Sequence, residues 1–169
     1  LKPMDYYDSA RFYPSFSNED KVRLFSVFGG IPYYNCLVDQ RLTVKENLLE
    51  LIVEPGARLE NEVPMYLGME IAKIANANEV FGALAQGYSR YKDIFDQSHV
   101  SSGPAMLDGL DKWARMELVQ TLAPINDPEN KRRSSYRIVD GLASFYYRYV
   151  FRYASQRSFM DTETFYARY

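Results

Sequence analysis

The sequence predicts a mainly α-helical protein with a small β-hairpin, in which a helical bundle precedes a winged helix-turn-helix domain. Apolar residues recur at helical spacing along most of the chain, and glycines and prolines divide them into short segments. Between Asn78 and Asp140, three helical patterns precede a strand, a basic loop and a second strand, which is the order of a winged helix. We therefore expect three parts, comprising residues 1–63, 64–140 and 141–169.

Composition limits the class of protein. Hydrophobic residues make up 47% of the 169 residues and charged residues 25%, which is the balance of a globular chain with a packed core. The formal charge of −2 disfavours a dominant polyanion-binding surface but leaves room for a local basic patch. Because Cys36 and His99 are the lone residues of their types, a disulfide framework and a zinc site built from cysteine and histidine are excluded.

The chain shows no targeting or membrane signal. No apolar run approaches the ~20 residues that span a bilayer, and no signal-peptide pattern opens the sequence. We therefore expect a cytoplasmic protein without membrane contact. The sequence begins at Leu1 rather than at a methionine, so we also expect a fragment of a longer protein.

The first part, residues 1–63, carries signals for three short helices after a turn-rich aromatic segment. The second of these helices is expected to bury Tyr33, Cys36 and Leu37. Capping side chains and prolines mark the helix starts, and glycines mark the ends. In chain order these signals are Ser17 with Asp20, Gly29 with Gly30, Pro32, Thr43 with Glu46, and Pro55 with Gly56.

The second part, residues 64–140, begins with a helix over 64–75, and the three helices of the winged helix follow. Their starts are marked in turn by Asn78, by Ser89, and by Ser101 or Ser102. The third helix has an inward apolar stripe formed by Met106, Leu110, Trp113 and Ala114.

The hairpin follows the third helix. Leu118, Gln120 and Leu122 alternate as residues of a strand do, and Asn126, Asp127 and Pro128 end that strand. Residues 134–139 form the returning strand, so the loop between them is the wing.

The third part, residues 141–169, begins with an aromatic helix at Gly141 whose apolar residues lie on more than one face. The simplest interpretation is a buried helix that leads to a further C-terminal domain, with a short helix after Asp161. Where such a domain is absent, exposed aromatic side chains are expected to favour self-association.

Three blocks of sequence, in this order, resemble a known family. They are YYDSARFYPSFSNEDKVRLFSVFGGIPYY, EPGARLENEV and SSYRIVDGLASFYYRYVF. They resemble the C-terminal half of the archaeal-type AAA ATPases, which belong to the signal-transduction class of P-loop NTPases. The resemblance implies a helical lid with a Gly-x-Pro motif, a winged helix and a further C-terminal domain, all downstream of an ATPase core.

Carried onto this sequence, the Gly-x-Pro motif falls on Gly30, Ile31 and Pro32. In related ATPases this proline lies near the adenine of the bound nucleotide. A rigid apolar ring offers a flat contact to a base, and a helix start leaves N–H groups for polar atoms. The resemblance therefore implies a lid that senses ATP or ADP in the full-length parent, although Pro32 equally fits the simpler role of a helix-start proline.

The Walker A lysine and the Walker B aspartate of the family have no counterpart in this sequence. We therefore expect no catalytic residue and no cofactor in this piece, and the expected partner is the upstream ATPase core. The sequence also departs from the family at two turns. Glu117 stands where the family often has glycine, which requires a left-handed residue with a side chain or a different turn, and Gly141 replaces a common proline.

Candidates for DNA contact lie on the third helix and in the wing loop. A basic wing loop can contact phosphates, although a solvated hairpin tip is the simpler interpretation. The third helix presents Asp108 and Asp111, whose carboxylates repel a phosphate-lined groove. The candidate residues are Ser102, Lys112, Arg115, Lys131, Arg132 and Arg133.

Two hypotheses follow. The first is a non-catalytic regulatory fragment of an AAA-type ATPase, with a nucleotide-sensing lid and a winged helix that docks a protein partner or duplex DNA. The second is a winged-helix transcription regulator that binds DNA. An enzyme is the least favoured class because the carboxylates are scattered and no nucleophile, base and acid fall in a recognisable pattern.

Overall fold

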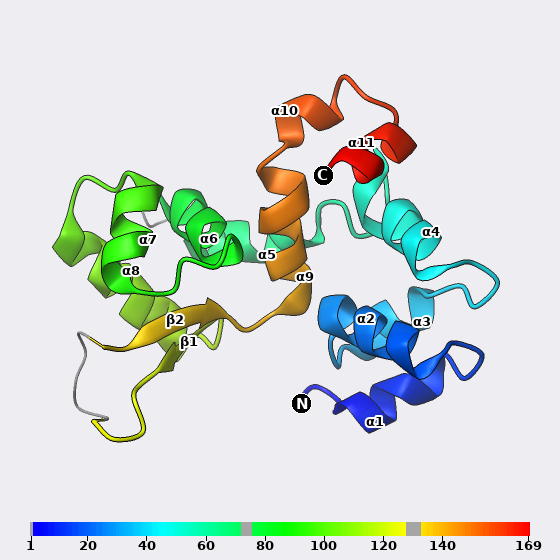
Figure 1. The fold of residues 1–169 in the computed structure, drawn as a ribbon, viewed down its shortest axis with the longest axis horizontal. Coiled ribbons are helices and arrows are strands. Elements are labelled where there is room, and N and C mark those ends of the chain that lie inside the picture. Colours follow the sequence, from blue (N-terminus) through cyan, green and yellow to red (C-terminus); the bar gives the residue numbers. More distant parts are fainter. Residues whose placement is uncertain (1, 72–75, 128–132) are drawn as a thin grey trace. The chain divides into compact units, whose positions relative to one another are not determined.

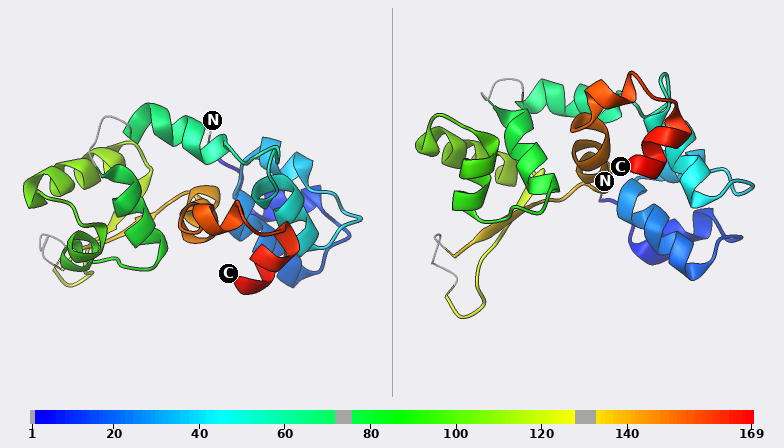
Figure 2. Two further views of the ribbon diagram at one scale, coloured as in Figure 1. Left: turned by 90° about the horizontal axis from the view of Figure 1, so that it is seen from above. Right: turned by 45° about the horizontal axis from the view of Figure 1, so that its top comes forward.

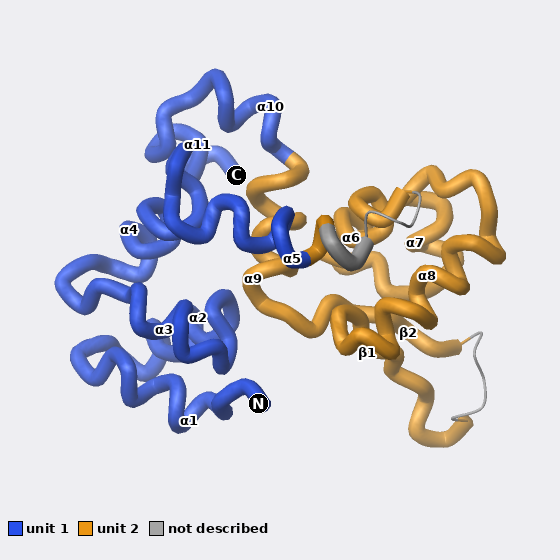
Figure 3. The backbone as a smooth tube through the Cα atoms, turned by 180° about the vertical axis from the view of Figure 1, so that it is seen from behind, with its two compact units in different colours: residues 1–66, 153–169 blue, residues 67–152 orange. Residues whose placement is uncertain are grey.

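The computed structural model describes residues 2–71, 76–127 and 133–169, and it is mainly helical with one two-stranded antiparallel sheet (Figures 1 and 2). This confirms the predicted mixture of helices and a small hairpin. The chain forms two compact units, one of residues 1–66 with 153–169 and the other of residues 67–152 (Figure 3). The predicted boundaries after residues 63 and 140 remain a prediction.

Unit 1 consists of short helices whose starts follow the expected capping signals. Ser17 accepts a hydrogen bond from the backbone of Asp20 at 3.1 Å, and Thr43 forms a reciprocal capping box with Glu46. The elements are α1 (Tyr6–Ser9), η1 (Ala10–Phe12), α2 (Asn18–Phe28), α3 (Pro32–Leu37), α4 (Val44–Leu48), η2 (Leu49–Val53), the first part of α5 (Glu62–Ile71), α10 (Ala154–Arg157) and α11 (Thr162–Arg168).

The C-terminal segment packs within unit 1. Phe165 of α11 is buried, and α11 contacts the π-helical turn η2 (Figure 1). Arg157 of α10 donates one hydrogen bond to the carbonyl of Val53 at 2.6 Å and another to the Glu60 carboxylate at 2.7 Å. The second oxygen of Glu60 accepts the backbone N–H of Gly56 at 2.7 Å, so one carboxylate joins a turn to the returning chain.

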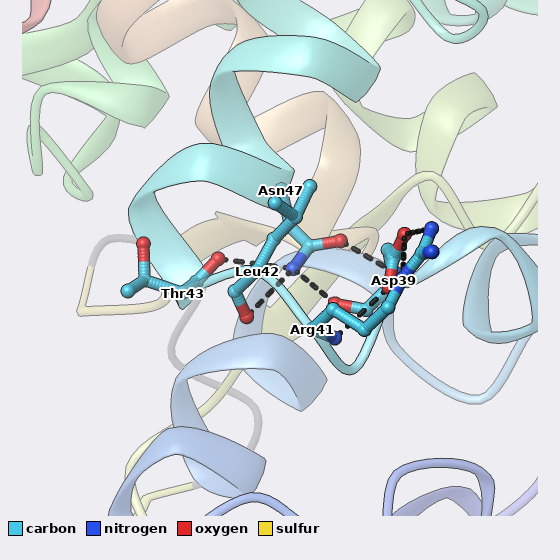
Figure 4. A network of polar contacts seen from close by, with 5 residues as sticks. All are labelled: Asp39, Arg41, Leu42, Thr43 and Asn47. Carbon is cyan, nitrogen blue, oxygen red and sulfur yellow. Dashed lines mark hydrogen bonds and ion pairs between the residues drawn. The ribbon is translucent and has the colours of Figure 1, made fainter.

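The loop between α3 and α4 is fixed by the buried side chain of Asn47 (Figure 4). Its amide nitrogen donates to the carbonyls of Asp39 and Thr43, both at 2.9 Å, and its oxygen accepts the N–H of Asp39 at 2.7 Å. Hydrogen bonds from the side chain and backbone of Arg41 hold the pKa of Asp39 at about 2. The loop is therefore held by side chains at positions that carry no turn-forming glycine.

Unit 2 contains the predicted succession of helices and strands. Ser102 caps the third helix as expected, by accepting the backbone N–H of Ala105 at 3.4 Å. The other two starts differ, because Asn76 in a left-handed conformation precedes the first helix and no side chain caps the second. The elements are α6 (Ala77–Ala85), α7 (Tyr91–Ser98), α8 (Gly103–Arg115), β1 (Val119–Leu122), β2 (Ser135–Ile138), α9 (Gly141–Phe145) and η3 (Tyr146–Phe151).

Aromatic rings form the centre of unit 2. Phe81 of α6 lies edge-on to Trp113 of α8 at a centroid distance of 5.1 Å and stacks on Tyr147 of η3 at 5.3 Å. Tyr147 donates its hydroxyl hydrogen to Asn78 at 2.8 Å, and burial raises the pKa of this phenol. Asn78, expected to be a helix cap, thus satisfies a buried hydroxyl instead, and Trp113 is core as its apolar stripe predicts.

The hairpin buries the face opposite to the one that Gln120 and Leu122 share. Leu118, Gln120 and Leu122 do share a face, but the buried residue of β1 is Val119, and Leu122 is 40% exposed. Val119 pairs with Ile138, and Leu122 pairs with Ser135. Because side chains alternate along a strand, the face that carries Gln120 and Leu122 is the one turned away from the core.

The turn before β1 shows how the chain accommodates Glu117 at a position where the similar family often has glycine. Glu117 has φ of +59°, so the chain places a left-handed residue with a side chain where glycine is the easier choice. Asp140 caps α9 by accepting the N–H of Ala143 at 2.7 Å, so the helix begins at Gly141 as expected. No helix in the described part of the chain combines the length and the apolar character that crossing a bilayer requires.

Candidate functional site

The Gly-Ile-Pro turn follows α2 and is built on two glycines with different roles. Gly29 ends α2 with φ of +56°, and its N–H donates to the carbonyl of Phe25 at 2.9 Å. Gly30 accepts the backbone N–H of Met4 at 2.9 Å, and a Cβ at this position would lie 2.0 Å from the carbonyl oxygen of Met4. The segment before α1 is therefore pressed directly against the turn, and only glycine fits there.

A buried polar network holds the turn from inside. The amide nitrogen of Asn35 donates to the carbonyls of Gly29 at 3.0 Å and Ile31 at 2.7 Å. Its oxygen accepts the hydroxyl of Tyr13 at 2.6 Å, and burial, reinforced by nearby Tyr6, raises the pKa of Tyr13 to about 12. Asn35 thus gives the Gly29 carbonyl a buried partner and adds a second donor to the Ile31 carbonyl, which also accepts the backbone N–H of Asn35 at 3.2 Å.

The sequence located this turn but misjudged the buried face of α3. Tyr34 and Asn35 are buried, whereas Tyr33 is 47% exposed and Cys36 is also exposed. Asparagine is a poor helix former, so its presence inside the six-residue helix α3 was the sequence signal that Asn35 has a buried polar role. Tyr13 carried no comparable signal because its partner lies 22 residues away.

Pro32 occupies the first turn of α3 and is exposed. Beside it, Arg58 donates its Nε hydrogen to the Tyr33 hydroxyl at 3.0 Å, and its guanidinium lies 5.8 Å from the centre of that ring. Tyr34 donates to the Glu62 carboxylate at 3.0 Å. Through these two contacts, the segment Glu54 to Val63 lies against the Gly-Ile-Pro turn.

An open depression of about 400 Å³ lies beside the same turn and is lined by Met4, Asp8, Arg11 and Phe12. Arg11 and Asp8 approach within 3.9 Å, and both side chains are well exposed. The surroundings of the turn thus present a flat ring, a guanidinium and a carboxylate to solvent. Within the described residues, no group of three or more histidine, cysteine, aspartate or glutamate side chains could hold a metal ion.

The residues predicted to contact DNA do not form one cluster. Ser102 lies at the start of α8 and Lys112 and Arg115 in its last turn, so Ser102 and Lys112 are separated by about 15 Å along the helix axis. Asp108 and Asp111 are exposed on the helix between them. In the wing, Arg133 is exposed, whereas Lys131 and Arg132 lie outside the described residues.

Comparison with known proteins gives little further help. No family model matches the sequence, and no solved structure matches it. An uncharacterized protein of Methanocaldococcus jannaschii is 24% identical over 154 residues, which cover 89% of this chain and 34% of that protein. The chain thus spans about a third of the length of this curated relative, so the activity of the longer protein is a matter for proposal.

Proposed function

We propose that this chain is the non-catalytic regulatory part of an AAA-type ATPase. Residues 1–63 act as a nucleotide-sensing lid, and the helix-and-hairpin region of unit 2 acts as a winged helix that docks a partner protein or DNA. ATP or ADP binds in the intact cytoplasmic parent, between its ATPase core and this lid.

The observation that carries the proposal is the contact of Met4 with Gly30. The segment that precedes α1 donates to the Gly30 carbonyl, and the turn has no room for a side chain. A displacement of the preceding chain is therefore transmitted to Pro32 through backbone contacts rather than through a flexible loop. Such a rigid joint suits a lid whose position depends on the bound nucleotide.

The meeting of separate sequence blocks also supports the proposal. Tyr13 reaches Asn35, Arg58 reaches Tyr33 and Glu62 reaches Tyr34, so the first two blocks that resemble the ATPase family meet around one turn. Two of the three blocks that carry the resemblance therefore share one structural neighbourhood within unit 1.

The arrangement of unit 2 supports a winged helix. Helices α6, α7 and α8 precede an antiparallel hairpin, and Arg90, which lies between α6 and α7, forms an antiparallel bridge with Ser135 of β2. This bridge joins the link between the first two helices to the edge of the hairpin, which supports the winged-helix interpretation.

The test uses the intact parent protein with its ATPase core. Replacement of Pro32 by alanine removes the rigid ring from the expected base contact, and we expect affinity for ADP to fall by about fivefold, which corresponds to about 1 kcal/mol. Pro14→Ala, at another exposed proline of unit 1, is the matched control. Equal ADP affinity in both variants, measured by calorimetric titration, would contradict the lid proposal.

A further inference from the structure

The hairpin presents a face that we name the outer sheet face, formed by Gln120, Leu122, Ser135, Arg137 and Val139. Tyr136 is buried, so its neighbours Ser135 and Arg137 point to the opposite side of the strand. The pairing of Leu122 with Ser135 and of Gln120 with Arg137 places all four side chains on that side.

Arg90 joins this face from outside the hairpin. It bridges Ser135 in antiparallel fashion, and the backbone N–H of Tyr136 donates to the carbonyl of Ser89 at 2.7 Å. Bridge partners present their side chains on the same side of a sheet, and the diagonal neighbour of Arg90 is Arg137, at about 7–8 Å between Cα atoms. Two arginines therefore lie close together on one exposed surface.

Neither arginine is neutralised by the described part of the chain. Arg137 donates its Nε hydrogen to the side-chain oxygen of Gln120 at 2.8 Å, which orients the guanidinium and leaves its outer edge available. No carboxylate lies within ion-pair distance of Arg90 or Arg137 among the described residues. The carboxylates nearest to them in sequence are Asp93, which lies in the first turn of α7, and Asp140, which caps α9, and neither forms an ion pair with these arginines.

The same face also carries aliphatic side chains. Leu122 is 40% exposed and Val139 is 54% exposed, and they lie on either side of the Gln120 and Arg137 pair. Large aliphatic side chains next to oriented arginines are typical of protein interfaces, in which apolar area supplies affinity and charge supplies orientation.

We propose that the outer sheet face docks a protein segment that combines carboxylates with aliphatic side chains. Charge complementarity identifies the occupant: two unpaired guanidiniums favour carboxylates, and the flanking Leu122 and Val139 favour aliphatic groups. A second copy of this face is disfavoured because it would set arginine against arginine. DNA is disfavoured because aliphatic side chains gain nothing from phosphates and because the neighbouring α8 exposes Asp108 and Asp111.

This inference rests on the proposed docking role of unit 2, and it names the class of partner and the surface. The lid proposal depends on Pro32 and on nucleotide, so the two can fail separately. Loss of the docking result leaves the ADP measurement unchanged, and the reverse also holds.

The experiment measures binding of the 169-residue chain to a fluorescent random copolymer of glutamate and leucine at low salt. We expect saturable binding that falls by about tenfold in the double variant Arg90→Ala, Arg137→Ala, because two exposed charge pairs together contribute about that factor. The double variant Lys112→Ala, Arg115→Ala removes the same charge from α8 and should bind as the unchanged chain does. Trp113 fluorescence, which reports on the core of unit 2, should be the same in all three proteins.

A second pair of variants tests the aliphatic contribution. Leu122→Ser, Val139→Ser should weaken binding of the glutamate and leucine copolymer and leave binding of polyglutamate unchanged. Three outcomes would overturn the proposal. They are no binding of the copolymer at low salt, equal loss of binding in the sheet and α8 variants, and tighter Arg90- and Arg137-dependent binding to random-sequence duplex DNA than to the copolymer.

Discussion

The Gly-Ile-Pro turn of unit 1 and the hairpin of unit 2 differ in how their polar groups are used. Those of the turn are hydrogen-bonded within the fold, whereas the arginines of the hairpin are open to solvent. At the turn, buried Asn35 and Tyr13 occupy the polar groups, and the Met4 backbone fills the space over Gly30. On the hairpin, Arg90 and Arg137 face outward with hydrogen-bonding capacity to spare. The contrast supports the two proposals made above, a rigid joint at the turn and a docking surface on the hairpin.

The sharpest test of the rigid joint is Gly30→Ala. The new methyl group would overlap the Met4 carbonyl, so the segment before α1 must move, and we expect unit 1 to lose about 3 kcal/mol or more. Circular dichroism during urea unfolding reports on both units. The fluorescence of Trp113, the single tryptophan of the sequence, reports on unit 2 alone and should not shift.

Gly82→Ala is the matched control for that measurement. Gly82 lies within α6, and no atom lies within 4 Å of an added Cβ, so alanine should be neutral or stabilise unit 2 by about 1 kcal/mol. A parallel shift of both signals in Gly30→Ala would show that the two units unfold together, and the proposed contrast between them would then fail.

A smaller effect is expected from Asn35→Ala. The substitution leaves the carbonyl of Gly29 and the hydroxyl of Tyr13 without their buried partner and removes one of the two donors to the Ile31 carbonyl, so it should destabilise unit 1 by about 2 kcal/mol. Tyr13→Phe removes only one of these hydrogen bonds and should cost about half as much. If both variants unfold at the same urea concentration as the unchanged chain, the turn does not depend on its buried network.

The smallest effect concerns the docking of the C-terminal segment through Glu60. Burial alone would raise the pKa of Glu60, but hydrogen bonds from Gly56 and Arg157 outweigh burial and lower it. A lowered pKa in the folded chain means that the stabilisation is present above the ordinary value of 4.5 and is lost as pH falls through the lowered folded value.

We therefore expect Glu60→Gln to destabilise unit 1 by about 1 kcal/mol at neutral pH and to reduce the loss of stability on acidification. Urea unfolding at a series of pH values measures both. Because Asp39 contributes acid sensitivity of the same sign, the Glu60→Gln profile should flatten without becoming level. An unchanged profile would remove Glu60 as a source of acid sensitivity.

The sequence foretold those features that depend on residues close together in the chain. Ser17, Thr43, Ser102 and Asp161 each cap the helix that begins after them, because an oxygen two or three residues before an unpaired N–H can reach it in nearly any context. The glycine pair before Pro32 belongs to the same class of signal.

Features that depend on distant partners were missed or misread. The alternation of Leu118, Gln120 and Leu122 indicated a strand, but which face is buried depends on how α6 and α8 pack against the sheet. Arg90 and Arg137 lie 47 positions apart and become neighbours only through the register with Ser135. The turn is therefore visible in the sequence, whereas the outer sheet face is formed only in the folded chain.

The division of the chain also affects the order in which its parts can fold during synthesis. Unit 1 includes residues 153–169, so Phe165 and Arg157 emerge only after every residue of unit 2 has been made. Domains usually fold in the order of translation. Unit 2 can therefore fold first on the ribosome. Residues 1–66 can complete their packing only after residues 153–169 have been made.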